Sequence, residues 1–383
     1  MKKLLLILLC LPMIGFGQLT YVPDNFFESY LESNGMGNGI PNDDYVTTAN
    51  IDTVISLDIS FMNISDLTGI EDFTALIELY IDDNNINSLD VSNNTLLEKL
   101  SCYFNSNLPI LDISNNTSLT YLNCHFTNLT ILDVSNNTAL TYLDCNHNNL
   151  TNLDVNTNVL LEELVCSGNQ LTSLDVSTNV LLEELDCSVN QLTNLDVSTN
   201  TSLKELYCFF NNLTSLNVNA NTDLIYLECF YNNLINLNLS TNTSLEELFC
   251  GDNQLTSLDV SANTALTELH CEDNQLTTLD LRNGNNTNMS TSSSYLNFAY
   301  NPNLTCISVD DAVWSTTYWT VANGNIDAQH YFSTNCPPPS AIEEHSTNKE
   351  LLRTIDVLGR ETKNKPLFYI YDDGTVEKRI TID

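Results

Sequence analysis

The sequence predicts a β-rich solenoid, in which short repeats stack and their strands pair in parallel with the copies in neighbouring repeats. The first observation is a fixed period. Cysteine recurs every 21 residues, with one step of 22, at positions 102, 124, 145, 166, 187, 208, 229, 250 and 271. The second is the shared pattern L-x-x-L-x-C-x-x-N-x-L-x-x-L-D-V-S-x-N-T, which is clearest from 140 to 280. Such periods are typical of repeat architectures.

Two short runs in each repeat, L-x-C and L-D-V, alternate as half-buried strands do. We therefore expect two parallel ladders with leucines inside. One buried leucine contributes roughly 1.5–3 kcal/mol, so a single repeat cannot offset its own chain entropy but a stack of repeats can.

The cysteines are predicted to be core residues. Ile81 stands where the pattern places cysteine, and a position that accepts isoleucine is apolar. Stacked copies lie about 4.8 Å apart with parallel side chains, whereas a disulfide needs converging Cβ atoms about 3.8 Å apart. We expect nine reduced, buried and unreactive thiols rather than a metal or redox centre.

Two asparagine columns end the two runs, where turning backbone would otherwise be buried without partners. An unmade hydrogen bond there costs on the order of 1–3 kcal/mol, and an amide can both donate and accept. Both columns are therefore predicted to be structural. The first comprises Asn84, Asn105, Asn148, Asn169, Asn190, Asn211, Asn232, Asn253 and Asn274, with Thr127 as its exception, and the second comprises Asn94, Asn116, Asn137, Asn158, Asn179, Asn200, Asn221, Asn242 and Asn263.

With "LxxLxCxxNxL" followed by "LDVSxNT" over about 57–281, the chain resembles bacterial leucine-rich repeat proteins. The resemblance implies a curved or nearly straight solenoid used for binding rather than catalysis. We assign the repeats to 51–305.

The N-terminus reads as a signal peptide followed by a cap. Residues 1–17, "MKKLLLILLCLPMIGFG", join two lysines to an apolar run too short to span a bilayer. Within the cap, assigned to 18–50, "YVPDNFFESYLESNG" predicts a helix with Asp24 as its N-cap. Its buried side is predicted to carry Phe26, Phe27, Tyr30 and Leu31.

A C-terminal cap is assigned to 306–336. It holds the only two cysteines of the exported chain that fall outside the period, Cys306 and Cys336. In an exported protein we favour a disulfide between them over two free thiols.

The tail, 350–383, follows a linker at 337–349, "PPPSAIEEHSTNK". Its alternating pattern and its Asp373-Gly374 turn predict a small β unit. "IDVLGRE" and "YIYDDGTVEKRI" at the very end resemble the C-terminal sorting domain of the type IX secretion system, although Pro366-Leu367 departs from the usual glycine. The resemblance implies recognition by that machinery at the outer membrane of a Bacteroidetes-type bacterium, and a released or surface-attached body. The residues that carry it are Asp356, Gly359, Arg360, Tyr369 and Lys378.

Charge excludes several partners. Residues 18–346 contain 42 acidic residues and only three basic ones, Lys99, Lys204 and Arg282. A body with a charge near −39 repels nucleic acid and anionic membrane. The sequence contains no HExxH, GxSxG or phosphate-binding glycine loop, so we do not expect an enzyme.

Aromatic residues flank the cysteines, on the side of the strand predicted to face outward. They fall into two groups separated by a small and polar middle, namely Val165, Ser167, Asp186 and Ser188. Such a surface suits a protein or a sugar ring, whereas the plain alternative is that aromatics favour β ladders. The candidate ligand-binding residues are Tyr80, Tyr103, Phe104, His125, Phe126, Tyr207, Phe209, Phe210, Phe230, Tyr231, Phe249 and His270, with His147 on the adjoining rim.

The L-D-V run carries a column of acids. Neighbours about 5 Å apart repel by roughly 0.8 kcal/mol in water, which makes Ca²⁺ a candidate ligand. We favour the alternative of a solvated acidic edge helped by Ser and Thr hydrogen bonds, and expect no cofactor. The column comprises Asp90, Asp112, Asp133, Asp154, Asp175, Asp196, Asn217, Asn238, Asp259 and Asp280.

The sequence thus predicts an exported binding protein that recognises a protein or glycan through its aromatic face, with adhesion as one role. The alternative is a structural surface component without a specific ligand.

Overall fold

The computed structural model describes residues 18–337 and, within the tail, residues 351–355, 368–371 and 376–378. Contacts divide the chain into two compact units, Met1–Cys336 and Pro337–Asp383. The predicted signal peptide, nearly all of the predicted linker, and Asp356, Gly359 and Arg360 lie outside the described residues.

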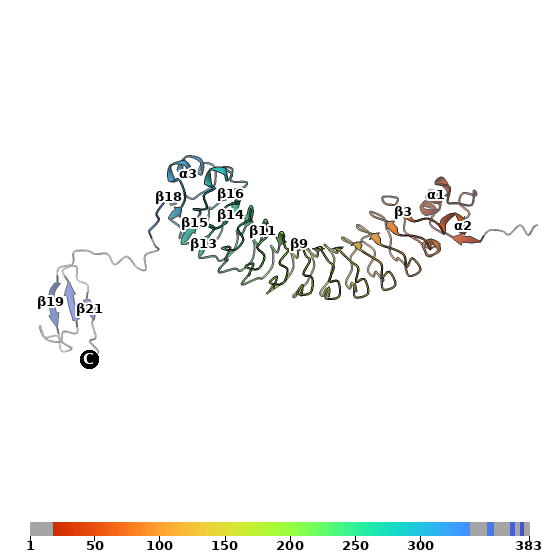
Figure 1. Ribbon diagram of the computed structural model, residues 1–383, viewed down its shortest axis with the longest axis horizontal. Coiled ribbons are helices and arrows are strands. Elements are labelled where there is room, and N and C mark those ends of the chain that lie inside the picture. The colour runs from red at the N-terminus through yellow and green to blue at the C-terminus, as the bar shows by residue number, and fades with distance from the viewer. Residues whose placement is uncertain (1–17, 338–350, 356–367, 372–375, 379–383) are drawn as a thin grey trace, which may run out of the picture. The chain divides into compact units, whose positions relative to one another are not determined.

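The first unit is a solenoid whose main sheet has twelve parallel strands in consecutive order. The sheet follows the inner side of an arc, while turns and loops follow the outer side (Figure 1). Its strands are β3 (Ser56–Asp58), β4 (Glu78–Tyr80), β5 (Lys99–Ser101), β6 (Tyr121–Asn123), β7 (Tyr142–Asp144), β8 (Glu163–Val165), β9 (Glu184–Asp186), β10 (Glu205–Tyr207), β11 (Tyr226–Glu228), β12 (Glu247–Phe249), β14 (Glu268–His270) and β16 (Leu296–Asn297).

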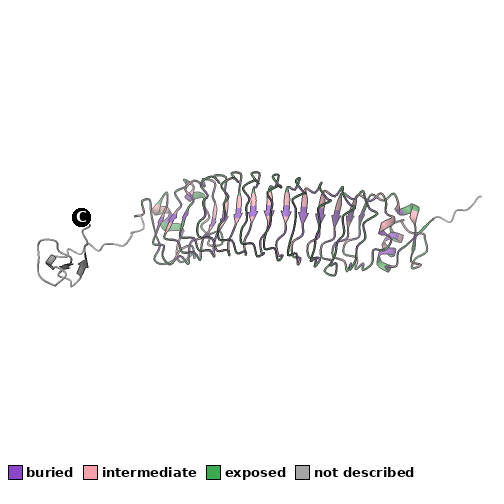
Figure 2. Ribbon diagram, turned by 90° about the horizontal axis from the view of Figure 1, so that it is seen from below, coloured by how far each residue is buried: buried purple, intermediate pink, exposed green. Residues whose placement is uncertain are grey.

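The predicted solenoid and its L-x-C strands are confirmed. Each strand places its central leucine beside the leucine of the next repeat, as Leu185, Leu206 and Leu227 do. These side chains are completely buried, and buried residues recur at the same place in successive repeats (Figure 2). A continuous apolar core therefore runs the length of the stack.

The nine repeat cysteines are all unpaired and fully buried, as predicted. Burial raises the pKa of every one of these thiols, to about 12 at Cys229. Because the thiolate is the reactive form, these cysteines act as small apolar core residues.

The two asparagine columns differ in how fully they are bonded. In the first, the Asn211 amide donates to the carbonyl oxygens of Cys187 and Cys208 at 3.0 and 3.2 Å, and its Oδ1 accepts from the Leu192 N–H at 2.9 Å. In the second, Asn221 donates to Val197 and Asn200 carbonyl oxygens. Every Oδ1 of that second column is buried without a partner among the described residues.

The second predicted ladder is largely wrong. The L-D-V run forms strands only near the C-terminal end, as β13 (Ser257–Asp259) and β15 (Thr278–Asp280); elsewhere it shows the isolated bridges Asp90↔Asp112 and Asp196↔Asn217. This run lies on the outer side of the arc, where β13 and β15 are seen in Figure 1. Repeats diverge on that side, so copies of the run rarely stay at the ~4.8 Å spacing of a ladder.

The N-terminal cap pairs β1 (Leu19–Tyr21) with β2 (Tyr45–Thr47) and contains α1 (Asn25–Ser33) and the short α2 (Thr48–Ile51). Asp24 caps α1 as predicted, since its Oδ1 accepts the Phe26 and Phe27 N–H groups at 2.9 and 3.1 Å. Phe27 and Leu31 are buried, but Phe26 is 58% exposed. The burial predicted for Phe26 is wrong because it lies on the opposite side of the helix from the Phe27–Leu31 pair.

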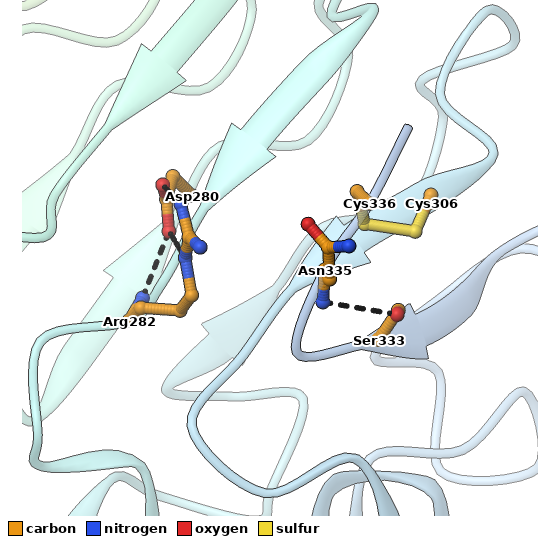
Figure 3. Close-up of a disulfide and its surroundings, with 6 residues drawn as sticks. All are labelled: Asp280, Arg282, Cys306, Ser333, Asn335 and Cys336. Carbon is orange, nitrogen blue, oxygen red and sulfur yellow. Dashed lines mark hydrogen bonds and ion pairs between the residues drawn. A yellow bond between two sulfur atoms is a disulfide. The ribbon is translucent and has the colours of Figure 1, made fainter. Parts of the chain in front are cut away.

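The C-terminal cap continues the β13–β15 sheet with β17 (Cys306–Ser308) and β18 (Tyr331–Ser333), and includes α3 (Ala312–Tyr318). The predicted Cys306–Cys336 disulfide is present (Figure 3). It covalently closes a 30-residue segment over the last repeats.

The short helices η1 (Ile70–Asp72) and η2 (Asn286–Asn288) are 3-10 turns. In the second unit, β19 (Leu351–Ile355), β20 (Phe368–Tyr371) and β21 (Val376–Lys378) form an antiparallel sheet. None of the helices in the described ranges is long and apolar enough to cross a membrane.

Candidate functional site

The outward side of the twelve-stranded sheet, here the concave face, carries most of the predicted site residues. Side chains alternate along each strand, so Leu206 and Cys208 point inward while Glu205, Tyr207 and Phe209 remain half-exposed. The residue after Phe209, Phe210, is 46% exposed at the edge of the sheet. The outward residues of successive repeats therefore form columns along the solenoid.

The N-terminal aromatic cluster consists of Tyr103, Phe104, His125, Phe126 and His147. Phe104 stacks on Phe126 with ring centroids 4.7 Å apart, and Phe126 stacks on His147 at 4.3 Å. Tyr103 stacks on His125 at 4.7 Å. Phe104, Phe126 and His147 also line a shallow hollow of about 350 Å³ with Ser106 and Asn128.

The C-terminal aromatic cluster is larger. Phe209 stacks on Phe230 at 4.7 Å and Phe210 on Tyr231 at 4.3 Å. A second chain of rings runs beside them, in which Tyr207 and Tyr226 lie 4.9 Å apart and Phe249 and His270 also lie 4.9 Å apart. The cluster comprises Tyr207, Phe209, Phe210, Tyr226, Phe230, Tyr231, Phe249 and His270.

Sequence reasoning missed three rings on the strands of this face and included one that stands apart. Tyr121 and Tyr142 stack at 4.4 Å, and Tyr226 joins the C-terminal cluster. All three are the first residue of their strand. The residue two positions later, just before the cysteine, also points outward, so the same alternation predicts that these rings are on the outward side of the sheet. Tyr80 forms no ring pair with other aromatic residues of the described chain.

The edge of the concave face, here the rim column, has an unusual backbone. Phe104, Phe126, Phe210 and Tyr231 have φ of 54°, 51°, 49° and 50°. This left-handed region suits glycine, asparagine and aspartate, and costs other residues roughly 1–2 kcal/mol each. Other repeats place Phe61, Asp83, His147, Gly168, Val189, Asp252, Asp273 and Tyr300 in the same conformation. Aromatic rings therefore stand where the backbone does not favour them.

Stacking limits which parts of these rings a ligand can reach. Phe104 and Phe126 are nearly parallel, at 5°, and Phe210 and Tyr231 at 9°, so they cover each other's faces. At the end of the first stack, a Cβ at Gly168 would lie 3.1 Å from the His147 ring, so the Gly168 backbone covers that face as well. Each stack thus covers one face of the ring at its end, and Phe126, between Phe104 and His147, is covered on both faces.

Carboxylates occupy the strand positions between Tyr142 and Tyr226. In one column the register runs Tyr142, Glu163, Glu184, Glu205, Tyr226. Asp186 stands beside Glu184 on β9. We call Glu163, Glu184, Asp186 and Glu205 the acidic strip. The prediction of a small and polar surface between the clusters is wrong for Ser167 and Ser188, which are only 6% and 1% exposed. The carboxylates of the acidic strip lie on that surface instead.

The acidic strip is electrostatically strained. Burial, with the charges of Glu163, Glu205 and Asp186, raises the pKa of Glu184 from about 4.5 to about 7. Burial and Asp144 raise the pKa of Glu163. Burial, reinforced by repulsion from neighbouring carboxylates, produces both shifts.

The basic residues of 18–337 form ion pairs with acids outside the acidic strip. Lys99 bonds Glu78 at 2.9 Å, Lys204 bonds Glu183 at 2.6 Å, and Arg282 pairs with Asp280. Two histidines lie at the margins of the face. His125 Nδ1 is 3.0 Å from Asp144 Oδ2, and His270 Nδ1 is 3.3 Å from Glu272 Oε1. Burial opposes protonation of His270, but Glu272 and the Ser294 carbonyl raise its pKa overall.

The acidic column of the L-D-V run serves the turns. Each side-chain oxygen accepts the backbone N–H two residues later, as Asp112 does from Ser114 and Asp196 from Ser198, both at 3.0 Å. Hydrogen bonds from the serine hydroxyl and N–H hold the pKa of both carboxyls below their usual range. Among the described residues, no group of three or more His, Cys, Asp or Glu side chains is placed to hold a metal ion.

Comparison with known proteins places this architecture in a family. The family model for leucine-rich repeats, in two copies, matches residues 243–283. The functional domain of InlJ from Listeria monocytogenes, which includes a cysteine ladder, is 38% identical over 76% of this chain and 68% of that one, with a TM-score of 0.67. The chain belongs to the leucine-rich repeat family. Members of this family are generally binding scaffolds rather than enzymes.

Two further structures share the leucine-rich repeat fold. The internalin InlF from L. monocytogenes is 19% identical over 83% of this chain and 97% of that one, with a TM-score of 0.58. The ectodomain of the Arabidopsis thaliana receptor kinase GASSHO1/SCHENGEN3, solved in complex with CASPARIAN STRIP INTEGRITY FACTOR 2, is 24% identical over 70% and 34% of the two chains, with a TM-score of 0.56. A search of curated protein sequences finds no match.

Proposed function

We propose that this leucine-rich repeat protein binds a protein partner through the two aromatic clusters of its concave face. The observation that carries the proposal is the rim column. Aromatic residues that merely favour β ladders belong in strands, whereas Phe104, Phe126, Phe210 and Tyr231 lie beyond the strands in left-handed turns. Backbone cost of this kind is typical of functional positions.

Ring orientation supports a protein over a polysaccharide. A sugar ring is bound best by a free aromatic face, but the Phe104–Phe126 and Phe210–Tyr231 stacks each cover one face of both of their rings. The exposed ring edges offer contact area to the aromatic and arginine side chains that are enriched in protein hot spots. The GASSHO1/SCHENGEN3 ectodomain was solved with a bound factor, which agrees with partner binding by this fold.

We also propose that the protein is exported, by a signal peptide at 1–17 and a type IX sorting domain at 350–383, to act outside the cell, either released or attached to the surface. The antiparallel β19–β21 sheet supports a separate tail unit, in which Tyr369 lies on β20 and Lys378 ends β21. If residues 350–383 are deleted, we expect the protein to stay in the host cell, on the inner side of the outer membrane.

The binding proposal is tested with arrays of extracellular proteins and polysaccharides. We expect saturable binding of the wild-type protein to a protein, at least tenfold weaker binding by the Phe209→Ala/Phe230→Ala variant, and an unfolding midpoint close to wild type. Phe26→Ala removes an exposed ring on the N-terminal cap and serves as the control. Undiminished binding by the double variant would show that the aromatic face is not the binding site. If no ligand is found for the wild-type protein, the alternative of a structural surface component is favoured.

A further inference from the structure

We propose that the partner segment bound by the concave face is cationic, with apolar side chains on the two aromatic clusters and arginine or lysine side chains on the acidic strip between them. This inference rests on the proposed function and specifies the chemistry of the partner.

The position of the acidic strip is the first argument. Glu163, Glu184 and Glu205 occupy three consecutive repeats of one column, directly between Tyr142 and Tyr226. A segment that runs along this column from Tyr142 to Tyr226 must cross these carboxylates. An acidic or uncharged segment would bury them without compensation, which is unfavourable.

The lack of internal counter-charges is the second argument. Within residues 18–337, Lys99, Lys204 and Arg282 all form ion pairs with acids outside the strip. In the described part of the chain, the strip carboxylates accept side-chain or N–H hydrogen bonds only from two residues. The Tyr207 hydroxyl lies 2.6 Å from Glu205 Oε2, and the Ser188 N–H and hydroxyl lie 2.9 and 2.6 Å from Asp186 Oδ1. Within residues 18–337, the repulsion is therefore left without an offsetting cation, which a cationic partner would supply. Arginine suits this place because its planar fork bonds carboxylates in pairs and also packs on aromatic rings.

The dimensions fit a short extended segment. His147 and Phe210 occupy equivalent rim positions three repeats apart, which corresponds to about 14 Å at the ~4.8 Å spacing of paired strands. An extended chain covers that distance with four to five residues. The partner is thus expected to place its basic residues within a window of that length, flanked on both sides by apolar anchors.

The test uses a random twelve-residue peptide library selected on the purified protein. We expect selected peptides to combine two or more Arg or Lys residues with flanking aliphatic or aromatic residues. Their affinity should fall at least tenfold for the Glu163→Gln/Glu184→Gln/Glu205→Gln variant. The matched control, Glu98→Gln/Glu162→Gln/Glu246→Gln, removes the same charge from exposed positions just before the strands and should change affinity less than twofold.

Each outcome decides the inference. Selection of no peptide, selection of peptides without basic residues, or equal losses in the two triple variants would overturn it. The Phe209→Ala/Phe230→Ala variant separates this failure from failure of the proposed function. Peptides that depend on the aromatic rings but not on the strip leave the binding face intact and refute only the cationic partner.

Discussion

At the scale of single residues, the rim column shows which side chains the fold favours at one backbone position and which it only tolerates. The same left-handed position holds glycine in one repeat, aspartate in three, histidine and valine in one each, and phenylalanine or tyrosine in six. Only glycine, asparagine and aspartate are favoured there by the backbone. The aromatic residues therefore lower stability locally, and a side chain that also serves no binding role should be replaceable with a gain in stability.

Val189 provides that test, because it is β-branched, has φ of 51° and is no part of the proposed site. We expect Val189→Gly to raise the free energy of unfolding by about 0.5–1 kcal/mol, since relief of the left-handed strain exceeds the entropy cost of glycine. Val180, which is 47% exposed against 44% for Val189 and has no positive φ, is the control. Val180→Gly should lower stability in the same urea titration. A loss at both positions would mean that the rim carries no strain.

Glu184 predicts a pH dependence of stability. Its pKa of about 7 in the folded protein lies above the usual value, so the folded state binds a proton more tightly than the unfolded state. The stability that this proton contributes is complete below about pH 4.5 and is lost as the pH rises through 7. Glu184→Gln cannot ionise and should therefore unfold about 1–3 °C above wild type at pH 8, with no advantage at pH 4. An advantage of equal size at both pH values would contradict the assigned cause.

At the scale of elements, the asparagine columns hold the turns between strands. Members of the first column donate and accept, while members of the second only donate to partners recorded among the described residues. The two columns look alike in the sequence, but they contribute differently because an unmade bond to a buried atom is costly.

We expect Asn211→Ala to lower the free energy of unfolding by at least about 2 kcal/mol, because it leaves the Leu192 N–H and the Cys187 carbonyl without this partner. Asn221→Ala should cost less, since it also removes an unbonded buried oxygen. The exposed neighbour Asn212 is the control, and Asn212→Ala should have little effect on the denaturation midpoint. Equal losses for Asn211→Ala and Asn221→Ala would refute the distinction.

Sequence alone predicted the elements that are determined by a short local pattern. The L-x-C strands, the buried cysteines, the Asp24 cap and the Cys306–Cys336 disulfide follow from alternation, spacing and compartment. The L-D-V run has the same alternation, yet it forms few ladders because curvature, a property of the whole stack, sets the distance between its copies. The acidic strip was missed because Glu163, Glu184 and Glu205 occupy the first strand position, whereas the predicted surface included only residues that flank the cysteines.

At the scale of the whole molecule, a stack of repeats is stable only if its ends are closed, since each repeat buries its leucines against neighbours. The α1 cap covers one end, and the disulfide-closed segment covers the other. In between, the stack holds two aromatic clusters at a fixed separation on one face, with the acidic strip between them. A rigid scaffold of this kind orders its binding groups before a partner arrives, which lowers the entropy cost of association.

The central claim is that rim aromatic residues are kept for recognition at a cost to the backbone. The most direct measurement uses one variant, Phe210→Gly/Tyr231→Gly. Its affinity for the partner found on the arrays and its unfolding midpoint are both compared with those of the wild-type protein. We expect at least a tenfold loss of affinity with stability within about 1 kcal/mol of wild type, because relief of left-handed strain offsets the lost ring stack. Unchanged affinity together with a marked loss of stability would show that the rings serve the fold, and would contradict the account.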